Sequence, residues 1–462
     1  MNTLIKNGTL VTSLSTYAGH IWIEDQTIRA VEDSPEAFQG VRFDSVIDAE
    51  GLFVLPGIID AHTHYLLESR GTVTADDFFS ASAAGAVGGV TTAVDFADQK
   101  PGLSLAGAAK QRIEASERDM AIDFGLHQCI FSTPSSIEEE LTELKSEGIT
   151  TVKIFTTYKR EGYFIGEEGL KELFAACLRM GLMVTAHCED DDLIDEISAS
   201  YLDKARPPSL HPVLRPAEAE YRAVKMIGEI AGEVKAPIYI VHLSSSRGAD
   251  AVRELRRRGV QVAVETTPHY LLLTEELLKL PDAQKYIMTP PLRSDADRAA
   301  LWSSLENEEI QIIATDHCTF TAAQKMQSED CTTVLPGIPG TEELLPLIYS
   351  RGVGDNHFDI RRLVSLLSEA PARYFGLFPG KGSLIPGTDA DIVLFDPEKE
   401  YVLENENRHT KAGYTPYAGT KLKGMPVLTM LRGEVIARNG QFTGRRGFGR
   451  FLPAGRSAIF GV

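Results

Sequence analysis

Two histidines one residue apart, His62 and His64, follow the apolar run 52–61. At the end of a buried strand, side chains two residues apart point to the same face, so these imidazoles could bind one metal ion. Two histidines at this spacing are also common neighbours on a polar strand face, so the pair alone is a weak indication. The metal interpretation depends on whether further ligands occur at comparable strand ends.

Further titratable side chains stand at the ends of later β-rich runs. They are Lys153, His187, His242 and Asp316. Each alone has an ordinary explanation, because such residues also satisfy backbone groups, carry surface charge or cap helices. Together they supply the imidazoles, the amine and the carboxylate of a metal-dependent hydrolytic site. We therefore predict that they converge on one metal centre.

Lys153 lies in the run 151–155 (TVKIF), whose other residues indicate a buried strand. Burial disfavours the charged ammonium and lowers its reference pKa of about 10.4 by several units. A neutral amine reacts with carbon dioxide, and the resulting carbamate could bridge two metal ions roughly 3.5–4 Å apart. The alternative is a lysine that reaches the barrel rim or pairs with an acid.

The elements that must position these residues form a repeating pattern of β-rich runs and helical segments. The β-rich runs are 52–61, 91–96, 121–132, 150–158, 182–188, 237–243, 260–267 and 310–317. Helices are expected at 76–87, 166–180, 217–233, 249–258 and 295–305. This α/β pattern predicts a closed (β/α)₈ TIM-type barrel, whose functional residues stand at the C-terminal ends of its strands.

Short alternating strands flank this pattern at both termini. They are expected at 4–8, 21–25, 390–395 and 427–436. Neither flank alone has enough strands to bury two faces, so we expect a smaller β-sandwich domain formed from both termini. The predicted division is a β-sandwich from 1–55 and 381–440, a catalytic barrel from 56–380 and a C-terminal arm from 441–462. The arm is a candidate contact with another subunit.

The composition is that of a compact globular protein, with 43% hydrophobic and 24% charged residues. The formal net charge of −19 would repel phosphate backbones and anionic lipid. We therefore expect a small neutral substrate and neither nucleic acid nor a membrane as a partner. The first residues do not read as a secretion signal, and the five cysteines lack CxxC spacing, so a cytoplasmic location is expected.

The motifs around these residues resemble those of the dihydropyrimidinase/hydantoinase family, which are cyclic amidohydrolases of the amidohydrolase superfamily. The matching segments are 57–64, 71–78, 152–158, 186–189, 241–244, 290–293 and 315–318. Their order and spacing agree over nearly the whole chain. The resemblance is therefore to the family and not only to the barrel.

The resemblance implies two zinc ions in each subunit, bridged by Lys153 as N6-carboxylysine. The remaining ligands would be His62, His64 and Asp316 on one ion, and His187 and His242 on the other. Glu189, close to His187 in the chain, is a candidate hydrogen-bond partner of a metal ligand. The resemblance also implies a homo-oligomer, either a tetramer or a dimer.

The implied reaction is hydrolysis of the cyclic amide bond of dihydropyrimidines and 5-substituted hydantoins to N-carbamoyl amino acids. In this mechanism a hydroxide bridging the metals attacks the ring carbonyl. Asp316 acts first as general base and then as general acid. Tyr158 would donate a hydrogen bond to the oxyanion, although an aromatic residue packed on the barrel rim is the other interpretation of that position.

Substrate recognition in the family uses main-chain groups, which position matching places at Thr289 and at the turn Pro336-Gly337, with Tyr158 beside them. The family commonly has serine where this chain has Thr289 and asparagine where it has Pro336. A main-chain carbonyl survives either change, but proline has no N–H to donate. The loop 65–70 also departs from the family pattern and could shape the pocket for the ring substituent.

Three alternatives remain at this point. Allantoin contains a hydantoin ring, so an allantoinase is the nearest alternative within the same class. A non-enzymatic scaffold of the same fold would have lost metal ligands, whereas every ligand position here is filled. A mononuclear deaminase on the same barrel would not need Lys153.

Overall fold

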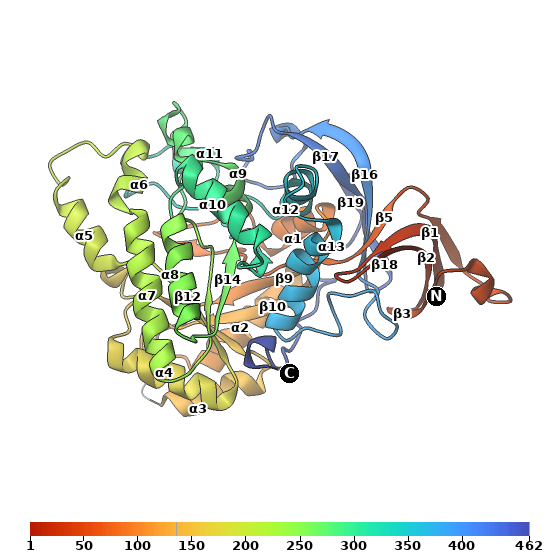
Figure 1. The fold of residues 1–462 in the computed structure, drawn as a ribbon, viewed down its shortest axis with the longest axis horizontal. Helices are drawn as coiled ribbons and strands as arrows, with labels where there is room; N and C mark the ends of the chain where they lie inside the picture. Colours follow the sequence, from red (N-terminus) through yellow and green to blue (C-terminus); the bar gives the residue numbers. More distant parts are fainter. Residues whose placement is uncertain (135, 462) are drawn as a thin grey trace.

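The computed structural model describes residues 1–134 and 136–461. It contains an eight-stranded parallel sheet surrounded by helices and a separate nine-stranded sheet built from both ends of the chain (Figure 1). The predicted combination of a (β/α)₈ barrel and a smaller β domain from both termini is therefore confirmed.

The parallel sheet has the order β15-β14-β13-β12-β11-β10-β9-β6, so neighbours in the chain are neighbours in the sheet. Its strands are β6 (Ile58–Asp60), β9 (Val90–Ala97), β10 (Asp123–Cys129), β11 (Thr151–Phe155), β12 (Met183–His187), β13 (Ile238–Ile240), β14 (Val262–Thr266) and β15 (Ile312–Ile313). A parallel bridge joins Thr63 to His317, and the His64 N–H donates to the His317 carbonyl at 2.8 Å. The extensions of the first and last strands thus meet, and the barrel closes on itself at its C-terminal end.

Helices pack around the outside of the barrel (Figure 1). The longer ones are α1 (Phe78–Val87), α2 (Leu105–Asp119), α3 (Ile137–Ser146), α4 (Glu167–Met180), α5 (Asp191–Ala199), α7 (Ala217–Glu233), α8 (Ser246–Arg257) and α10 (Asp295–Glu306). The shorter ones are α6 (His211–Leu214), α9 (Pro268–Leu272), α11 (Ala322–Lys325), α12 (Leu344–Ile348), α13 (Ile360–Val364) and α14 (Ala370–Tyr374). Among the described residues, no helix combines the length and the apolar character that a membrane crossing requires.

The second sheet joins the two ends of the chain. Its strands are β1 (Asn2–Val11), β2 (Thr16–Glu24), β3 (Thr27–Glu32), β4 (Ser45–Asp48), β5 (Phe53–Pro56), β16 (Ile392–Val402), β17 (Lys421–Leu431), β18 (Glu434–Arg438) and β19 (Gln441–Phe442). β5 pairs with β1 on one side and with β16 on the other. Ile23 on β2 and Met430 on β17 belong to one hydrophobic core, so the continuous sheet encloses apolar side chains from both halves. A separate short hairpin joins β7 (Glu68–Ser69) to β8 (Thr72–Val73).

The apolar run 52–61 is not the single strand that we expected. Its first half forms β5 in the terminal sheet, and its second half forms β6 in the barrel. Gly57 connects them: its N–H donates to the Asp391 carbonyl at 2.8 Å, and a Cβ there would collide with the Thr91 side chain. The chain therefore passes from one sheet to the other at a position that only glycine fits.

The C-terminal arm, a candidate contact with another subunit, packs on the barrel of its own chain. The Phe124 N–H donates to the Arg450 carbonyl at 3.0 Å, and the Leu452 N–H donates to the Phe124 carbonyl at 2.8 Å. Main-chain pairing of this kind needs no hydrophobic periodicity, which explains why the segment shows none. Val462, the last residue of the predicted arm, lies outside the described residues.

Candidate metal centre and substrate cavity

A cavity of ≈ 310 Å³ lies at the C-terminal mouth of the barrel. Every residue predicted to bind metal or substrate lines it: His62, His64, Lys153, Tyr158, His187, His242, Thr289, Asp316, Pro336 and Gly337. Parallel strands of a barrel end at the same mouth, so residues far apart in the chain meet there. The structure therefore brings the whole predicted set together.

His62, His64 and Asp316 form a close group. Asp316 Oδ1 lies 3.3 Å from His62 Nε2 and 3.1 Å from His64 Nε2. One ligand atom from each residue lies within 4.8 Å of the others, which suits a single metal ion. Although burial opposes ionisation of Asp316, the two imidazoles hold its pKa well below the usual range. Burial lowers the pKa of His62, which favours the neutral imidazole that binds metal.

His187 and His242 form a second pair, with ring centroids 4.6 Å apart. Burial lowers the pKa of both imidazoles. His187 Nε2 lies 2.8 Å from Glu189 Oε2, and Arg215 pairs with the same carboxylate at 2.7 Å. This contact occupies Nε2 and leaves Nδ1 of His187 as the nitrogen that could bind a metal ion.

Lys153, on β11, lines the same cavity as the two histidine groups and is 1% exposed. In the part of the chain that the structure describes, no carboxylate lies within 4.0 Å of its Nζ, and the rings of Phe96 and Phe155 lie 5.3 and 5.4 Å away. Burial lowers the pKa of the amine to about 8. The alternative of a lysine that reaches the rim or pairs with an acid is therefore wrong.

Three of the predicted residues have a left-handed backbone. The φ angles are 70° at Tyr158, 38° at His242 and 51° at Asp316. Non-glycine residues rarely adopt this conformation, which costs about 1–3 kcal/mol each and persists only where the surrounding structure imposes it. Such strain clusters at functional sites, so its occurrence at three cavity residues supports a catalytic interpretation.

Comparison with known proteins identifies the family. Residues 53–436 match the profile described as Amidohydrolase family. The chain is 36% identical to the D-hydantoinase of Ralstonia pickettii over 457 residues, which covers 98% of each protein. The crystal structure of dihydropyrimidinase from Brevibacillus agri NCHU1002 has a TM-score of 0.95 at 34% identity and covers 99% of this chain and 100% of that chain. This chain belongs to the amidohydrolase family, in its dihydropyrimidinase/hydantoinase branch.

A more distant structure in this branch of the amidohydrolase family is L-hydantoinase (dihydropyrimidinase) from Arthrobacter aurescens. It has a TM-score of 0.86 at 26% identity and covers 97% of this chain and 99% of that chain. This chain is thus more similar in sequence to the D-hydantoinase than to the L-hydantoinase.

Glu265 is a residue of this amidohydrolase site that sequence reasoning missed. It lies on β14, where its Oε1 is 2.7 Å from His62 Nδ1 and accepts the main-chain N–H of His242 at 3.2 Å. Its Oε2 accepts the Tyr239 hydroxyl at 3.0 Å. One carboxylate therefore contacts one member of each histidine group. The available signal was an acid inside the apolar run 260–267, since a buried charge is costly unless it is paired.

We expect Glu265→Gln to weaken metal binding about 10- to 100-fold, the usual effect of losing a hydrogen-bonded partner of a metal ligand. The substitution keeps the shape of the side chain but replaces the carboxyl group that faces His62 Nδ1 with an amide. Metal content after dialysis against graded chelator concentrations measures the change. Glu306→Gln is a matched control, because Glu306 also contacts a histidine nitrogen, His357 Nδ1, at 2.7 Å. This pair does not line the cavity. Equal metal retention by the two variants would rule out this role for Glu265.

Tyr158 is held at the cavity by its main chain. Its N–H donates to Asp191 Oδ1 at 2.7 Å, and the Thr157 hydroxyl donates to the same oxygen at 2.7 Å. Burial raises the pKa of Tyr158, so its hydroxyl remains a hydrogen-bond donor at neutral pH. The hydroxyl also lies next to Thr289, the other predicted substrate contact.

The turn Pro336-Gly337 lines the cavity, but the main-chain groups of Gly337 are engaged within the protein. The Gly337 N–H donates to the Ile287 carbonyl at 2.9 Å, and the Gly337 carbonyl accepts from Lys325 Nζ at 2.6 Å. Proline lacks an N–H. The Pro336 carbonyl accepts a long contact from the Cys318 thiol at 3.9 Å and is the main-chain group of this turn that a substrate could use.

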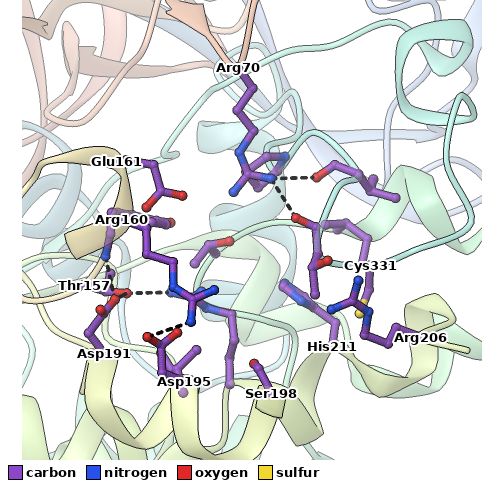
Figure 2. Close-up of a pocket in the computed structure, with 18 residues that line it drawn as sticks. Arg70, Thr157, Arg160, Glu161, Asp191, Asp195, Ser198, Arg206, His211 and Cys331 are labelled. Atoms are coloured by element: carbon purple, nitrogen blue, oxygen red, sulfur yellow. Dashed lines mark hydrogen bonds and ion pairs between the residues drawn. The ribbon is translucent and has the colours of Figure 1, made fainter. Parts of the chain in front are cut away.

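A second cavity of ≈ 270 Å³ adjoins the first. The residues that line both are Arg70, Tyr158, Glu161, Thr289 and Pro336. Figure 2 shows Arg70 reaching in from one side and Arg160 beside Asp195 on the other. Arg160 pairs with Asp195 at 3.1 Å, whereas Arg70 donates to the carbonyls of Thr332 and Val334 at 3.1 and 3.4 Å. The loop 65–70 thus contributes Arg70 to both cavities.

Proposed function

We propose that this protein is a metal-dependent cyclic amidohydrolase that opens dihydropyrimidines and 5-substituted hydantoins to N-carbamoyl amino acids. The observation that carries the proposal is the convergence of four imidazoles, Lys153 and Asp316 on one cavity. Similarity to a D-hydantoinase and a dihydropyrimidinase over nearly the whole chain supports the substrate class. These relatives do not favour the allantoinase alternative, and the filled ligand set does not favour a non-enzymatic scaffold.

The donor set fits two divalent ions, which we propose to be zinc. His62, His64 and Asp316 would hold one ion and His187 and His242 the other. When bound, the ions would activate a water molecule and polarise the substrate carbonyl. Lys153 would bridge them as N6-carboxylysine, which forms when its neutral amine nitrogen bonds to the carbon of carbon dioxide and loses one proton.

The residues of the chain would then guide the proton and the substrate ring. Asp316 takes a proton from the attacking water and passes it to the ring nitrogen as the carbon–nitrogen bond breaks. Tyr158 donates a hydrogen bond to the carbonyl oxygen as negative charge develops on it. The main-chain carbonyls of Thr289 and Pro336 accept hydrogen bonds from ring N–H groups and orient the ring.

One wall of the cavity is aromatic, which suits an apolar substituent on the ring. Phe131 and Tyr163 stack with centroids 4.0 Å apart, and Phe155 lies 5.5 Å from Tyr163. Aromatic side chains bind apolar groups through large contact areas. Because the chain is more similar to the D-hydantoinase than to the L-hydantoinase, we propose the D enantiomer of aromatic 5-substituted hydantoins as a substrate.

Rates on dihydrouracil, D- and L-5-phenylhydantoin and allantoin test the substrate class. We expect the zinc-loaded protein to hydrolyse D-5-phenylhydantoin at least about ten-fold faster than the L enantiomer or allantoin, a preference that corresponds to about 1.4 kcal/mol. Removal of the metal with a chelator should abolish the activity, and added zinc should restore it. Background rates on all four compounds with the metals bound would refute the substrate class, and a preference for allantoin would favour the alternative.

We also propose a cytoplasmic homo-oligomer, either a tetramer or a dimer. All five cysteines are free and buried, which suits a reducing compartment. Light scattering coupled to size-exclusion chromatography measures the oligomeric state.

A further inference from the structure

Lys325, at the C-terminal end of α11, is fully buried and is not one of the proposed metal or substrate ligands. Its Nζ donates to the Ile287 carbonyl at 2.7 Å and to the Gly337 carbonyl at 2.6 Å. Across the described residues, no carboxylate lies within 4.0 Å of this nitrogen. Burying an amine without a counter-ion is costly, so the position calls for a functional or structural reason.

The two hydrogen bonds of Lys325 do not require a charged side chain. Burial lowers the pKa of Lys325 to about 7. The neutral amine keeps two N–H groups, which match the two carbonyls in number. The amine therefore connects two main-chain oxygens in either protonation state.

The two carbonyls belong to the two segments that carry the proposed substrate contacts. Ile287 stands two residues before Thr289, and Gly337 follows Pro336 directly. The segments also bond to each other, because the Gly337 N–H donates to the Ile287 carbonyl at 2.9 Å. Lys325 thus adds a second connection between the same two segments, because its Nζ bonds to the Ile287 carbonyl of one and the Gly337 carbonyl of the other.

The second segment has little room to move. Gly337 has a φ of 139°, and a Cβ at this position would collide with the Cys318 carbonyl. The Cys318 N–H donates to the Ile338 carbonyl at 3.1 Å, which ties this segment to the residues that follow Asp316. A small displacement of the Gly337 carbonyl would therefore move Pro336 relative to the catalytic carboxylate.

We propose that Lys325 is a positioning residue, which holds the Thr289 and Pro336 segments at the separation that the substrate ring requires. It acts from behind the cavity wall and touches neither the substrate nor the proposed metal ligands. The inference rests on the proposed function, because the ring N–H groups of a cyclic amide are the groups that these segments would recognise. Losing the connection should weaken ring binding and leave the metal centre intact.

Lys325→Met tests this role, because methionine keeps an unbranched apolar stem but has no N–H to donate. We expect KM for D-5-phenylhydantoin to rise about ten-fold with kcat within about two-fold, the pattern of an interaction that contributes equally to ground-state and transition-state binding. Metal content should equal that of the wild type. Hydrogen–deuterium exchange should become faster in peptides that cover 287–289 and 336–338 and remain unchanged elsewhere.

Lys285→Met is the matched control, because Lys285 lies two residues from Ile287 but pairs with Asp282 at 2.9 Å. Its KM should stay at the wild-type value. A wild-type KM in Lys325→Met, or a loss of metal together with kcat, would overturn the positioning role. If Lys325→Met does not fold, Lys325→Gln, which retains amide donors, should show an intermediate KM, and an unchanged KM there would equally overturn it. Inactivity of the wild-type protein would instead refute the proposed function.

Discussion

Replacing Lys153 by alanine is expected to reduce hydrolysis of the cyclic substrate by on the order of 10⁴-fold or more, since metal ions contribute several kcal/mol to transition-state stabilisation. Lys153 is the one proposed ligand residue that both ions would share, so its loss should lower both the metal content and the activity. Its buried position, without a carboxylate partner within the described part of the chain, provides no competing structural role for a charged amine. Metal analysis of the purified variant and its kcat/KM measure the two effects together.

Chemical rescue separates the carboxylate of modified Lys153 from the rest of its side chain. The space left by alanine could admit acetate, propionate or butyrate, and we expect one of these acids to restore part of the activity when zinc is also added. Lys110→Ala is the control, because Lys110 forms an exposed ion pair with Glu147 at 3.1 Å, and such pairs contribute little to stability. Lys153→Ala that keeps both ions and the wild-type rate would disprove the bridging role. An intact mass of the wild-type protein that lacks the mass of added carbon dioxide would also disprove the bridging role.

The barrel and the converging residues could be predicted because both depend on a regular pattern. Buried parallel strands appear as apolar runs, and their C-terminal ends meet at one mouth whatever the loops between them do. The side chains at the end of each run, such as His187 as the last residue of β12 and His242 two residues after β13, could therefore be assigned to one cavity without knowledge of strand register.

The features that could not be predicted depend on contacts between segments distant in the chain. The apolar pattern of 52–61 is the same whether it forms one strand or two, and only the fit of Gly57 against Thr91 shows where the chain changes sheets. The contact of Glu265 with His62 requires the register across the barrel. Lys325 bonds to two main-chain carbonyls, and because every residue has one, the sequence does not indicate which carbonyls it contacts.

Asp316→Asn is expected to lower kcat/KM roughly 10³-fold, within the range that general acid–base catalysis contributes. Asparagine has nearly the same shape as aspartate, but its amide cannot accept a proton from water and deliver it to the ring nitrogen. The effect on chemistry must be separated from an effect on metal binding, because Asp316 Oδ1 faces both His62 and His64. Rates should therefore be expressed per metal-loaded protein, after the variant has been saturated with zinc.

The two roles of Asp316 lead to different results. If it serves only as a ligand, saturation with zinc should bring Asp316→Asn back to a rate close to the wild type. If it also transfers the proton, the deficit should remain at full metal content, because the amide of asparagine cannot take the place of the carboxylate that the His62 and His64 imidazoles keep ionised. Asp295→Asn, which alters a surface pair with Arg298 on α10, should keep the wild-type rate and serves as the control. A persistent deficit with both ions bound would assign the proton transfer to Asp316, whereas full recovery of the rate would limit the role of Asp316 to metal binding.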